Sequence, residues 1–174
     1  MENFISLSLR DDEWEFSYID HDRQIVRAIV IDDDNNFYFL RLIRNDIFGN
    51  AQLIESAGGG VEDDENLEEA IIRELREELG VEVDIITKLG VVSDYYNLIH
   101  RHNINHYFLC KINSFGESNM TDAEINDFHL STLKLSYEEA ISEYERAREF
   151  KLGRLIASRE LPILELAGKI LLFD

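Results

Sequence analysis

The chain has 174 residues, 45% hydrophobic and 30% charged, a composition typical of a globular protein with a core rather than of a disordered chain. Its formal net charge of −19 disfavours nucleic acid and anionic membranes as partners. The single cysteine, Cys110, excludes an internal disulfide, and the sequence has neither a long apolar run nor a secretory signal. We therefore expect one cytoplasmic domain spanning residues 1–174.

The first part of the chain predicts strands joined by short turns. Residues 27–31 and 37–43 are rich in β-branched and aromatic side chains, and the polar residues 32–36 between them are typical of a hairpin turn. Residues 52–57 predict a short strand that runs into three glycines, Gly58 to Gly60.

The rest of the chain alternates helices and strands. Residues 65–79 predict a helix that stops at Gly80, and Ser136 with Glu139 forms a capping box for a helix at 136–150. The other expected elements are one or two strands within 81–92, a strand at 105–112, a polar loop at 114–132 and a helix within 159–172 that has Pro162 near its start. Such a mixture predicts a layered α/β or α+β domain.

The helix at 65–79 carries its acids in an unusual place. At about 100° per residue, Glu74, Glu77 and Glu78 fall in the same sector as the apolar residues of the first two turns, whereas Glu69 and Arg76 lie on the outer side. We therefore expect the three carboxylates to point into a cleft beside the core. Partly buried carboxylates need a counter-charge.

A divalent cation would supply that counter-charge. Mg²⁺, or Mn²⁺ in its place, prefers oxygen ligands and commonly bridges protein carboxylates to substrate phosphates. Gly58, Gly59 and Gly60 allow the backbone to approach a ligand closely, and an exposed carbonyl there would be a further metal ligand.

These residues resemble a known motif. Gly59, Glu65 and the run Arg73-Glu74-Leu75-Arg76-Glu77-Glu78-Leu79-Gly80-Val81 match all nine specified positions of a Nudix box. The resemblance implies the α/β/α sandwich of that family with a mixed central sheet. It also implies metal-dependent hydrolysis of a nucleoside diphosphate linked to another group.

The resemblance further implies roles for individual residues. Glu77, Glu78 and the Gly58 carbonyl would be metal ligands, and Glu74 a ligand or the general base. Arg73 would orient the acids through ion pairs, with Glu65 as support. The base in this family can instead come from a later loop, where Glu117, Asp122 and Glu124 are candidates and Glu124 is preferred; a plain solvated acid is an equal interpretation of Glu124.

The substrate is less strongly indicated. Arg41, Arg44 and Glu55 stand before the glycines in a pattern similar to that of ADP-ribose and other nucleotide-sugar pyrophosphatases, and we predict that they contact substrate. Arg41 and Arg44 face opposite sides of an ideal strand, so at most one enters the site. Ala57 replaces a proline usual in that subgroup, Asp64 replaces a glycine, and the proline that often follows the box in these enzymes is missing, since residues 82–107 contain none.

Several other residues have alternative interpretations. His100, His102 and His106 have spacings compatible with zinc, although a polar hairpin loop fits better. Tyr95 and Tyr96 could stack on a base or could simply pack. Trp14 is expected in the core or at a dimer contact, and the resemblance implies that residues 1–24 contribute to a homodimer.

Three functions remain in competition. The leading one is a hydrolase of a small nucleoside diphosphate derivative. The second is a Nudix-fold module that binds a nucleotide without turnover, but such modules tend to lose box carboxylates that are intact here. The third, a simple divalent-cation binder, leaves the glycine turn and Arg73 unexplained.

Overall fold

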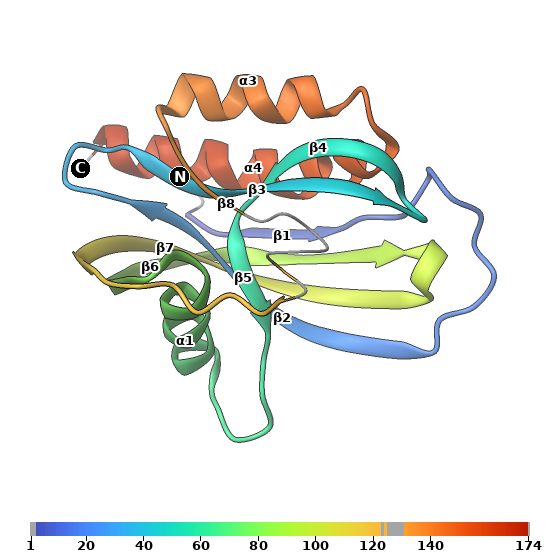
Figure 1. Cartoon of the computed structure of the whole chain (residues 1–174), viewed down its shortest axis with the longest axis horizontal. Coiled ribbons are helices and arrows are strands. Elements are labelled where there is room, and N and C mark those ends of the chain that lie inside the picture. The colour runs from blue at the N-terminus through green and yellow to red at the C-terminus, as the bar shows by residue number, and fades with distance from the viewer. Residues whose placement is uncertain (1–2, 123, 125–130, 174) are drawn as a thin grey trace.

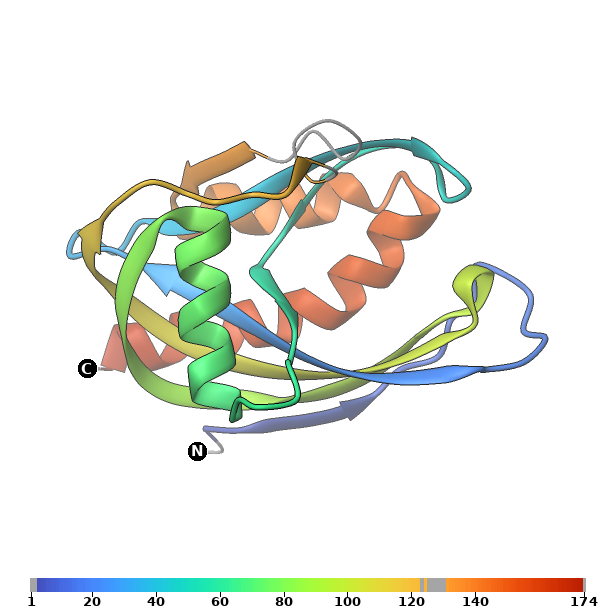
Figure 2. The ribbon, with the colours of Figure 1, turned by 60° about the horizontal axis from the view of Figure 1, so that its bottom comes forward.

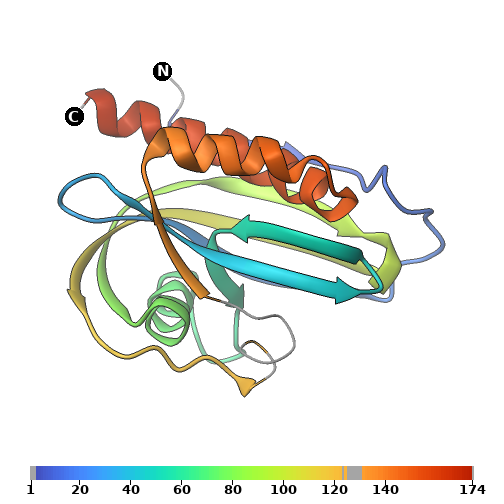
Figure 3. The same ribbon diagram turned by 45° about the horizontal axis from the view of Figure 1, so that its top comes forward.

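The computed structural model describes residues 3–122, 124 and 131–173, and within these ranges the chain forms three layers (Figure 1). A mixed sheet lies between helix α1, Leu67–Leu79, on one face and helices α3, Tyr137–Ala147, and α4, Lys151–Phe173, on the other. The two C-terminal helices run side by side across their face (Figure 3). The predicted α/β/α sandwich is confirmed.

The strands of the described chain join one sheet in the order β1-β6-β7-β2-β3-β4, with β5 paired to β2 and β8 to β3. The pairs β1/β6 and β2/β7 are parallel and the others antiparallel. The strands are β1, Ile5–Ser8; β2, His21–Ile31; β3, Phe37–Asp46; β4, Gly49–Glu55; β5, Ala57–Gly60; β6, Val81–Tyr96; β7, Arg101–Phe115; and β8, Ser131–Leu135.

The sheet divides between β2 and β3. These strands pair only beside their turn, at Val30 with Tyr38 and Ile31 with Phe37. Beyond that point they diverge, and β5 takes the place of β3 by pairing with residues 25–28 of β2. Figure 2 shows β3 and β4 rising away from the curved surface that β2, β6 and β7 form. A cleft opens along this division.

Each face of the sheet has its own hydrophobic core. Alternation along β2 sends Ile29 and Ile31 toward α3 and α4, and sends Val26, Ala28 and Val30 toward α1. Burial on both faces explains why residues 25–31 form an almost continuous apolar run. β2 therefore lies at the centre of the molecule, where its start can carry functional side chains into the cleft.

Helix α1 begins and ends at local signals in the sequence. The Asn66 side chain accepts from the Glu69 N–H while the Glu69 carboxylate accepts from the Asn66 N–H, so a capping box fixes the first turn. Gly80 ends the helix in the left-handed conformation, with φ 66° and ψ 37°, as predicted. The helix starts at Leu67 rather than 65, because the extended residue Asn66 is its N-cap.

Three expectations about the strands need correction. Residues 52–57 belong to two strands rather than one. β4, which pairs with β3, ends at Glu55, and β5, which pairs with β2, starts at Ala57. Residues 101–104 are strand rather than loop, so the predicted strand at 105–112 starts earlier, at Arg101. β8 covers residues 131–135, so residues 131 and 132, predicted as the end of a loop, are strand. Residues 123 and 125–130 of that predicted loop lie outside the described residues.

The last helix is longer than its sequence pattern indicates. α4 starts at Lys151, so Pro162 lies inside the helix and not near its start. Proline cannot donate the backbone hydrogen bond of an interior position. Burial of Leu161, Ile163 and Leu164 in the core of the α3–α4 face offsets that loss.

The capping box of α3 allows a direct test. The Ser136 hydroxyl accepts from the Glu139 N–H at 3.1 Å, and the Glu139 carboxylate accepts from the Ser136 N–H. We expect Ser136→Ala to lower the free energy of unfolding by about 1 kcal/mol. Urea denaturation measures this loss. An unchanged midpoint would mean that tertiary packing alone fixes the helix start.

Candidate active site

Helix α1 presents its second-half carboxylates to the cleft, as its periodicity predicts. Glu74 and Glu78 are only 9% and 7% exposed, whereas the Glu77 side chain is 45% exposed. They line a cavity of about 670 Å³ together with the glycines of β5 and the start of β2. Glu69 and Arg76, predicted on the outer side, are exposed.

Arg73 holds the acidic cluster together. Its Nε and NH2 donate to the two Glu65 oxygens at 2.9 and 2.5 Å, and its NH1 donates to Glu74 at 2.8 Å and Glu77 at 3.3 Å. NH2 also donates to the Gly60 carbonyl at 3.0 Å, which ties the helix to β5. These contacts agree with the ion pairs expected of Arg73 and with the supporting position expected of Glu65.

Among the described residues, Glu78 has no contact with a basic side chain comparable to those that Arg73 makes with the other acids. Its carboxylate accepts from the Gly58 N–H at 3.2 Å and forms no ion pair with any residue that the structure describes. Burial, together with the neighbouring Glu74 and Glu124, raises the pKa of Glu78 well above its ordinary range. Burial also raises the pKa of Glu74, against the opposing effect of Arg73.

The glycines of β5 permit this close packing. A Cβ on Gly59 would lie 2.5 Å from a Glu74 oxygen, and a Cβ on Gly58 would lie 2.0 Å from the Val26 carbonyl oxygen. A side chain at position 58 would push β5 away from β2, and one at position 59 would take the place of the Glu74 carboxylate. The glycine turn therefore brings backbone and carboxylate oxygens to one place.

The donor set fits a hard divalent cation. Two buried carboxylates of raised pKa and a third, half-exposed one supply the oxygen ligands that Mg²⁺ and Mn²⁺ prefer. Within the described ranges, no three metal-ligating side chains lie close enough together to hold an ion as they stand. Glu74 and Glu77 instead form ion pairs with Arg73. Cation binding would thus exchange part of that ion pairing for coordination.

The loop after β7 brings one of its acids to the site. Glu124 and Thr121 line the same cavity, whereas Glu117 and Asp122 do not. The Glu124 carboxylate accepts from the Thr121 N–H at 2.8 Å, and its charge contributes to the raised pKa of Glu74 and Glu78. Its role as general base stays a prediction, but its position is compatible with one.

The two arginines of β3 separate as their spacing predicts. Arg44 lines the cleft, with its guanidinium donating to Asp46 at 2.8 and 2.6 Å and lying over the Phe48 ring at 4.9 Å. Arg41 points to the other side of the strand, where it is exposed. Of the two, only Arg44 is placed to contact a ligand in the cleft.

Glu55 lies between two arginines. One carboxylate oxygen is 3.1 Å from Arg27 NH1, and the other accepts from Arg159 NH2 at 2.7 Å. Although burial alone would raise the pKa of Glu55, these two cations lower it. Glu55 lines the cleft as expected, but both of its oxygens already have partners within the protein.

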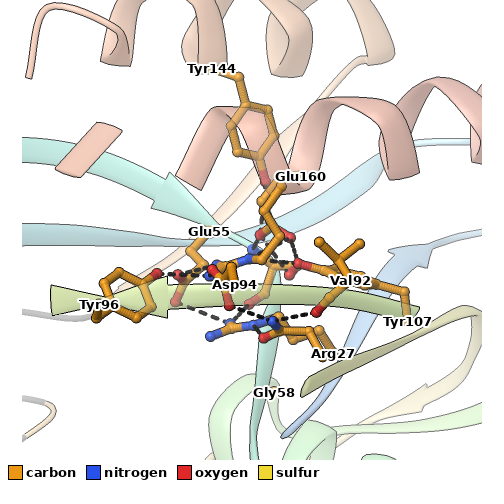
Figure 4. Close-up of polar contacts among 12 residues, drawn as sticks. Arg27, Glu55, Gly58, Val92, Asp94, Tyr96, Tyr107, Tyr144 and Glu160 are labelled. Carbon is orange, nitrogen blue, oxygen red and sulfur yellow. Dashed lines mark hydrogen bonds and ion pairs between the residues drawn. The ribbon is translucent and has the colours of Figure 1, made fainter. Parts of the chain in front are cut away.

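Glu55 belongs to a buried polar network that sequence reasoning missed (Figure 4). Arg159, fully buried on α4, donates to Glu55, Asp94, Tyr96 and Tyr107. Neighbouring Glu160 accepts from the Ser56 N–H and hydroxyl, both at 2.7 Å, and from the Tyr107 and Tyr144 hydroxyls. The network thereby fixes Ser56, where β4 passes into β5.

One sequence signal could have revealed this network. Arg159 and Glu160 are consecutive charges inside the apolar run of α4, between Ile156 and Ala157 on one side and Leu161 and Ile163 on the other. Charges within a buried helix need partners. The identity of those partners depends on β4 and β6, which no local pattern connects to α4.

The remaining candidates have structural contacts. His102 bonds to Ser93 and Asp22, and His106 to Lys88 and Gln24, so these histidines do not converge. Tyr95 stacks on His102, and Tyr96 is buried in the network described above. Trp14 packs on the core and contacts the Phe48 ring edge-on at 5.5 Å.

Solved structures share this architecture. A NUDIX hydrolase from Nitrosomonas europaea is 19% identical, with a TM-score of 0.57 over 71% of this chain and 78% of the other. The ORF135 protein of E. coli is 24% identical, with a TM-score of 0.58 over 86% and 90%. A MutT protein from Methanosarcina mazei Go1 is 22% identical, with a TM-score of 0.54 over 74% and 85%. At these identities the likeness is one of fold.

The sequence itself matches a family model. Comparison with curated proteins gave no significant match. The NUDIX domain model, however, matches residues 21–152, which run from the start of β2 to the first turn of α4 and include the whole carboxylate cluster. The chain therefore belongs to the NUDIX family of pyrophosphohydrolases.

Proposed function

We propose that this protein hydrolyses the diphosphate of a nucleotide-sugar such as ADP-ribose, with Mg²⁺ or Mn²⁺ bound by Glu74, Glu77, Glu78 and the Gly58 carbonyl. The observation that carries the proposal is the pair of buried carboxylates, Glu74 and Glu78, whose pKa values are raised at the edge of an arginine-containing cleft. A cation there would neutralise substrate phosphates and activate a water molecule.

The protein's own groups have defined tasks in this proposal. Arg73 keeps the Glu74 and Glu77 carboxylates oriented while they exchange partners. Glu124 or Glu74 accepts the proton of the attacking water. Arg44, on the opposite wall, faces the part of the substrate that extends away from the carboxylates. The products are a nucleoside monophosphate and a second phosphorylated compound.

The first experiment measures product formation from nucleotide-sugars, dinucleotides, coenzyme A and nucleoside triphosphates with Mg²⁺ or Mn²⁺. We expect turnover of one class, and a decrease of about 10²-fold or more in Glu77→Gln because a carboxylate ligand is lost. Glu68→Gln, an exposed acid on the same helix, is the matched control and should keep full activity.

A nucleotide-binding module is the alternative function. It would bind one member of the panel tightly without converting it, in the wild type as in Glu77→Gln.

Two further expectations are part of the proposal: a homodimer that involves residues 1–24, and a cytoplasmic location. Sedimentation of the full chain beside a variant lacking residues 1–24 tests the first. Of the helices that the structure describes, none is long and apolar enough to cross a membrane.

A further inference from the structure

The cleft has a second chamber beyond the carboxylates. This cavity of about 460 Å³ lies between the start of β2 and β7, the end of the β3–β4 hairpin and the first turns of α4. It shares Arg23, Ile25, Arg27, Leu42, Arg44 and Glu55 with the carboxylate cavity, so the two form one continuous cleft. A ligand held by the carboxylates would extend into it.

Asn103, on β7, is the first sign that the chamber binds something. The residue is 1% exposed, it lines the chamber, and its Oδ1 is buried without a hydrogen-bond partner. It is the one side chain with such an atom among the described residues. Buried polar atoms in native proteins are almost always satisfied, so an unpaired amide at a cavity wall indicates a missing partner.

Two arginines beside Asn103 form no ion pair with any residue that the structure describes. Arg23 is the register partner of Asn103, and its guanidinium forms no hydrogen bond or ion pair with any described residue. The Arg101 side chain donates to His21 at 3.1 Å and forms no ion pair with any described residue. Burial and the charges of Arg101 and Arg27 lower the pKa of Arg23, and the charge of Glu74 offsets this only in part. An anion would relieve this repulsion.

The positions of the two arginines differ. Arg23 lines both cavities and its guanidinium lies over Gly60, where a Cβ would be 2.6 Å from NH2. It therefore stands at the junction, within reach of a phosphate that the carboxylate cluster holds. Arg101 lines only the second chamber. A phosphate at the junction would pair with Arg23, and an uncharged polar group of the same ligand would pair with Asn103.

The other walls of the chamber suit a flat ring. Phe48, Tyr96 and Ile99 line it, and Phe48 is fixed by edge-on contacts with Trp14 at 5.5 Å and Tyr96 at 6.0 Å. The Arg44 guanidinium already lies over the Phe48 ring at 4.9 Å, so a planar heterocycle would pack against this fixed arginine–phenylalanine pair with little loss of side-chain entropy. A sugar alone would leave much of this apolar surface in contact with water.

We propose that the second chamber is a nucleobase site, in which the Asn103 amide pairs with the base and Arg23 binds the phosphate attached to the nucleoside. An asparagine amide offers one acceptor and two donors, which matches the adjacent donor and acceptor that each common base presents. The inference rests on the proposed function and deepens it, because it assigns the nucleoside half of the substrate to this chamber.

The test measures binding rather than turnover. The affinities of AMP, GMP, CMP, UMP and ribose 5-phosphate are determined by calorimetry for the wild type, Asn103→Leu, Arg23→Met and the control Asn113→Leu, an exposed asparagine on the same strand. We expect Asn103→Leu to weaken the tightest nucleotide about 10- to 100-fold and to leave ribose 5-phosphate unchanged. Arg23→Met should weaken both ligands.

Thermal unfolding separates a binding role from a structural one. Leucine has the same branching as asparagine, its larger methyl groups can extend into the chamber, and no described side-chain hydrogen bond is lost, so Asn103→Leu should melt near the wild-type temperature. Unchanged nucleotide affinity in Asn103→Leu would mean that water satisfies the amide, and would overturn the inference. So would equal losses for nucleotide and ribose 5-phosphate, or wild-type protein that binds none of the four nucleotides.

The binding data also distinguish this inference from the proposed function. Asn103-dependent nucleotide binding without turnover of any panel substrate would support the base site and reject the hydrolase. Turnover that persists with an unchanged KM in Asn103→Leu would support the hydrolase and reject the base site.

Discussion

Replacing Glu78 by glutamine is expected to make the metal-free protein more stable while reducing turnover by about 10²- to 10⁴-fold. The carboxylate is buried beside Glu74 and Glu124, and the Gly58 N–H is its only hydrogen-bond donor among the described residues. A neutral amide keeps an oxygen for Gly58 without the cost of a buried charge. The gain should be about 1–3 kcal/mol at neutral pH.

The gain should depend on pH in a defined direction. Because the pKa of Glu78 is raised in the folded state, ionisation destabilises the protein as pH rises from the unfolded-state value, about 4.3, to the folded-state value. Below that window both proteins carry a neutral side chain and should unfold alike. Above it, Glu78→Gln should melt several degrees higher than the wild type.

Thermal melts with a chelator, at acidic and neutral pH, measure this difference, and Glu68→Gln is the exposed control. Addition of Mg²⁺ or Mn²⁺ should then stabilise the wild type and have little effect on Glu78→Gln. If the variant were less stable than the wild type at neutral pH without metal, Glu78 would have a structural role that its contacts do not explain.

Replacing Arg159 by methionine is expected to lower the free energy of unfolding by about 3–5 kcal/mol. Arg159 is 0% exposed and neutralises Glu55, Asp94 and Glu160, which would remain buried without it. Arg148→Met is the matched control, because Arg148 forms an exposed ion pair with Glu145 and should contribute less than about 1 kcal/mol.

Denaturant titration of Arg159→Met and Arg148→Met compares the two arginines. A double variant, Arg159→Met with Glu55→Gln, tests the reason for the loss. If an unpaired carboxylate causes it, the second substitution should recover part of the stability instead of adding to the damage. Strictly additive losses would show that Arg159 stabilises α4 independently of Glu55.

The carboxylate helix could be predicted almost completely from the sequence. The positions of Glu74 and Glu78 relative to Ala70 and Ile71 follow from helical geometry alone, and the capping signals at Asn66 and Gly80 are local. The separation of Arg41 from Arg44 likewise follows from strand alternation. Each of these predictions depends on residues within one element, where sequence spacing determines spatial arrangement.

The other half of the cleft could not be predicted in this way. Asn103 meets Arg23 because β7 pairs in parallel with β2, eighty residues away, and Arg159 meets Glu55 because α4 crosses β4. Local sequence alone predicts a polar loop at residues 100–106, because it does not identify the neighbouring strand to which His102 and His106 bond. Long-range pairing, and not residue type, places these groups.

The division of the sheet puts the carboxylates and one wall of the second chamber on separate parts of the chain. β2, β5 and α1 carry the groups that would cut the diphosphate, while the β3–β4 hairpin, joined to β2 through only two residue pairs, contributes a wall of the second chamber. Mutations in the hairpin can therefore reshape ligand preference without displacing the carboxylates. This arrangement allows substrate choice to diverge in evolution while the hydrolytic machinery is inherited intact.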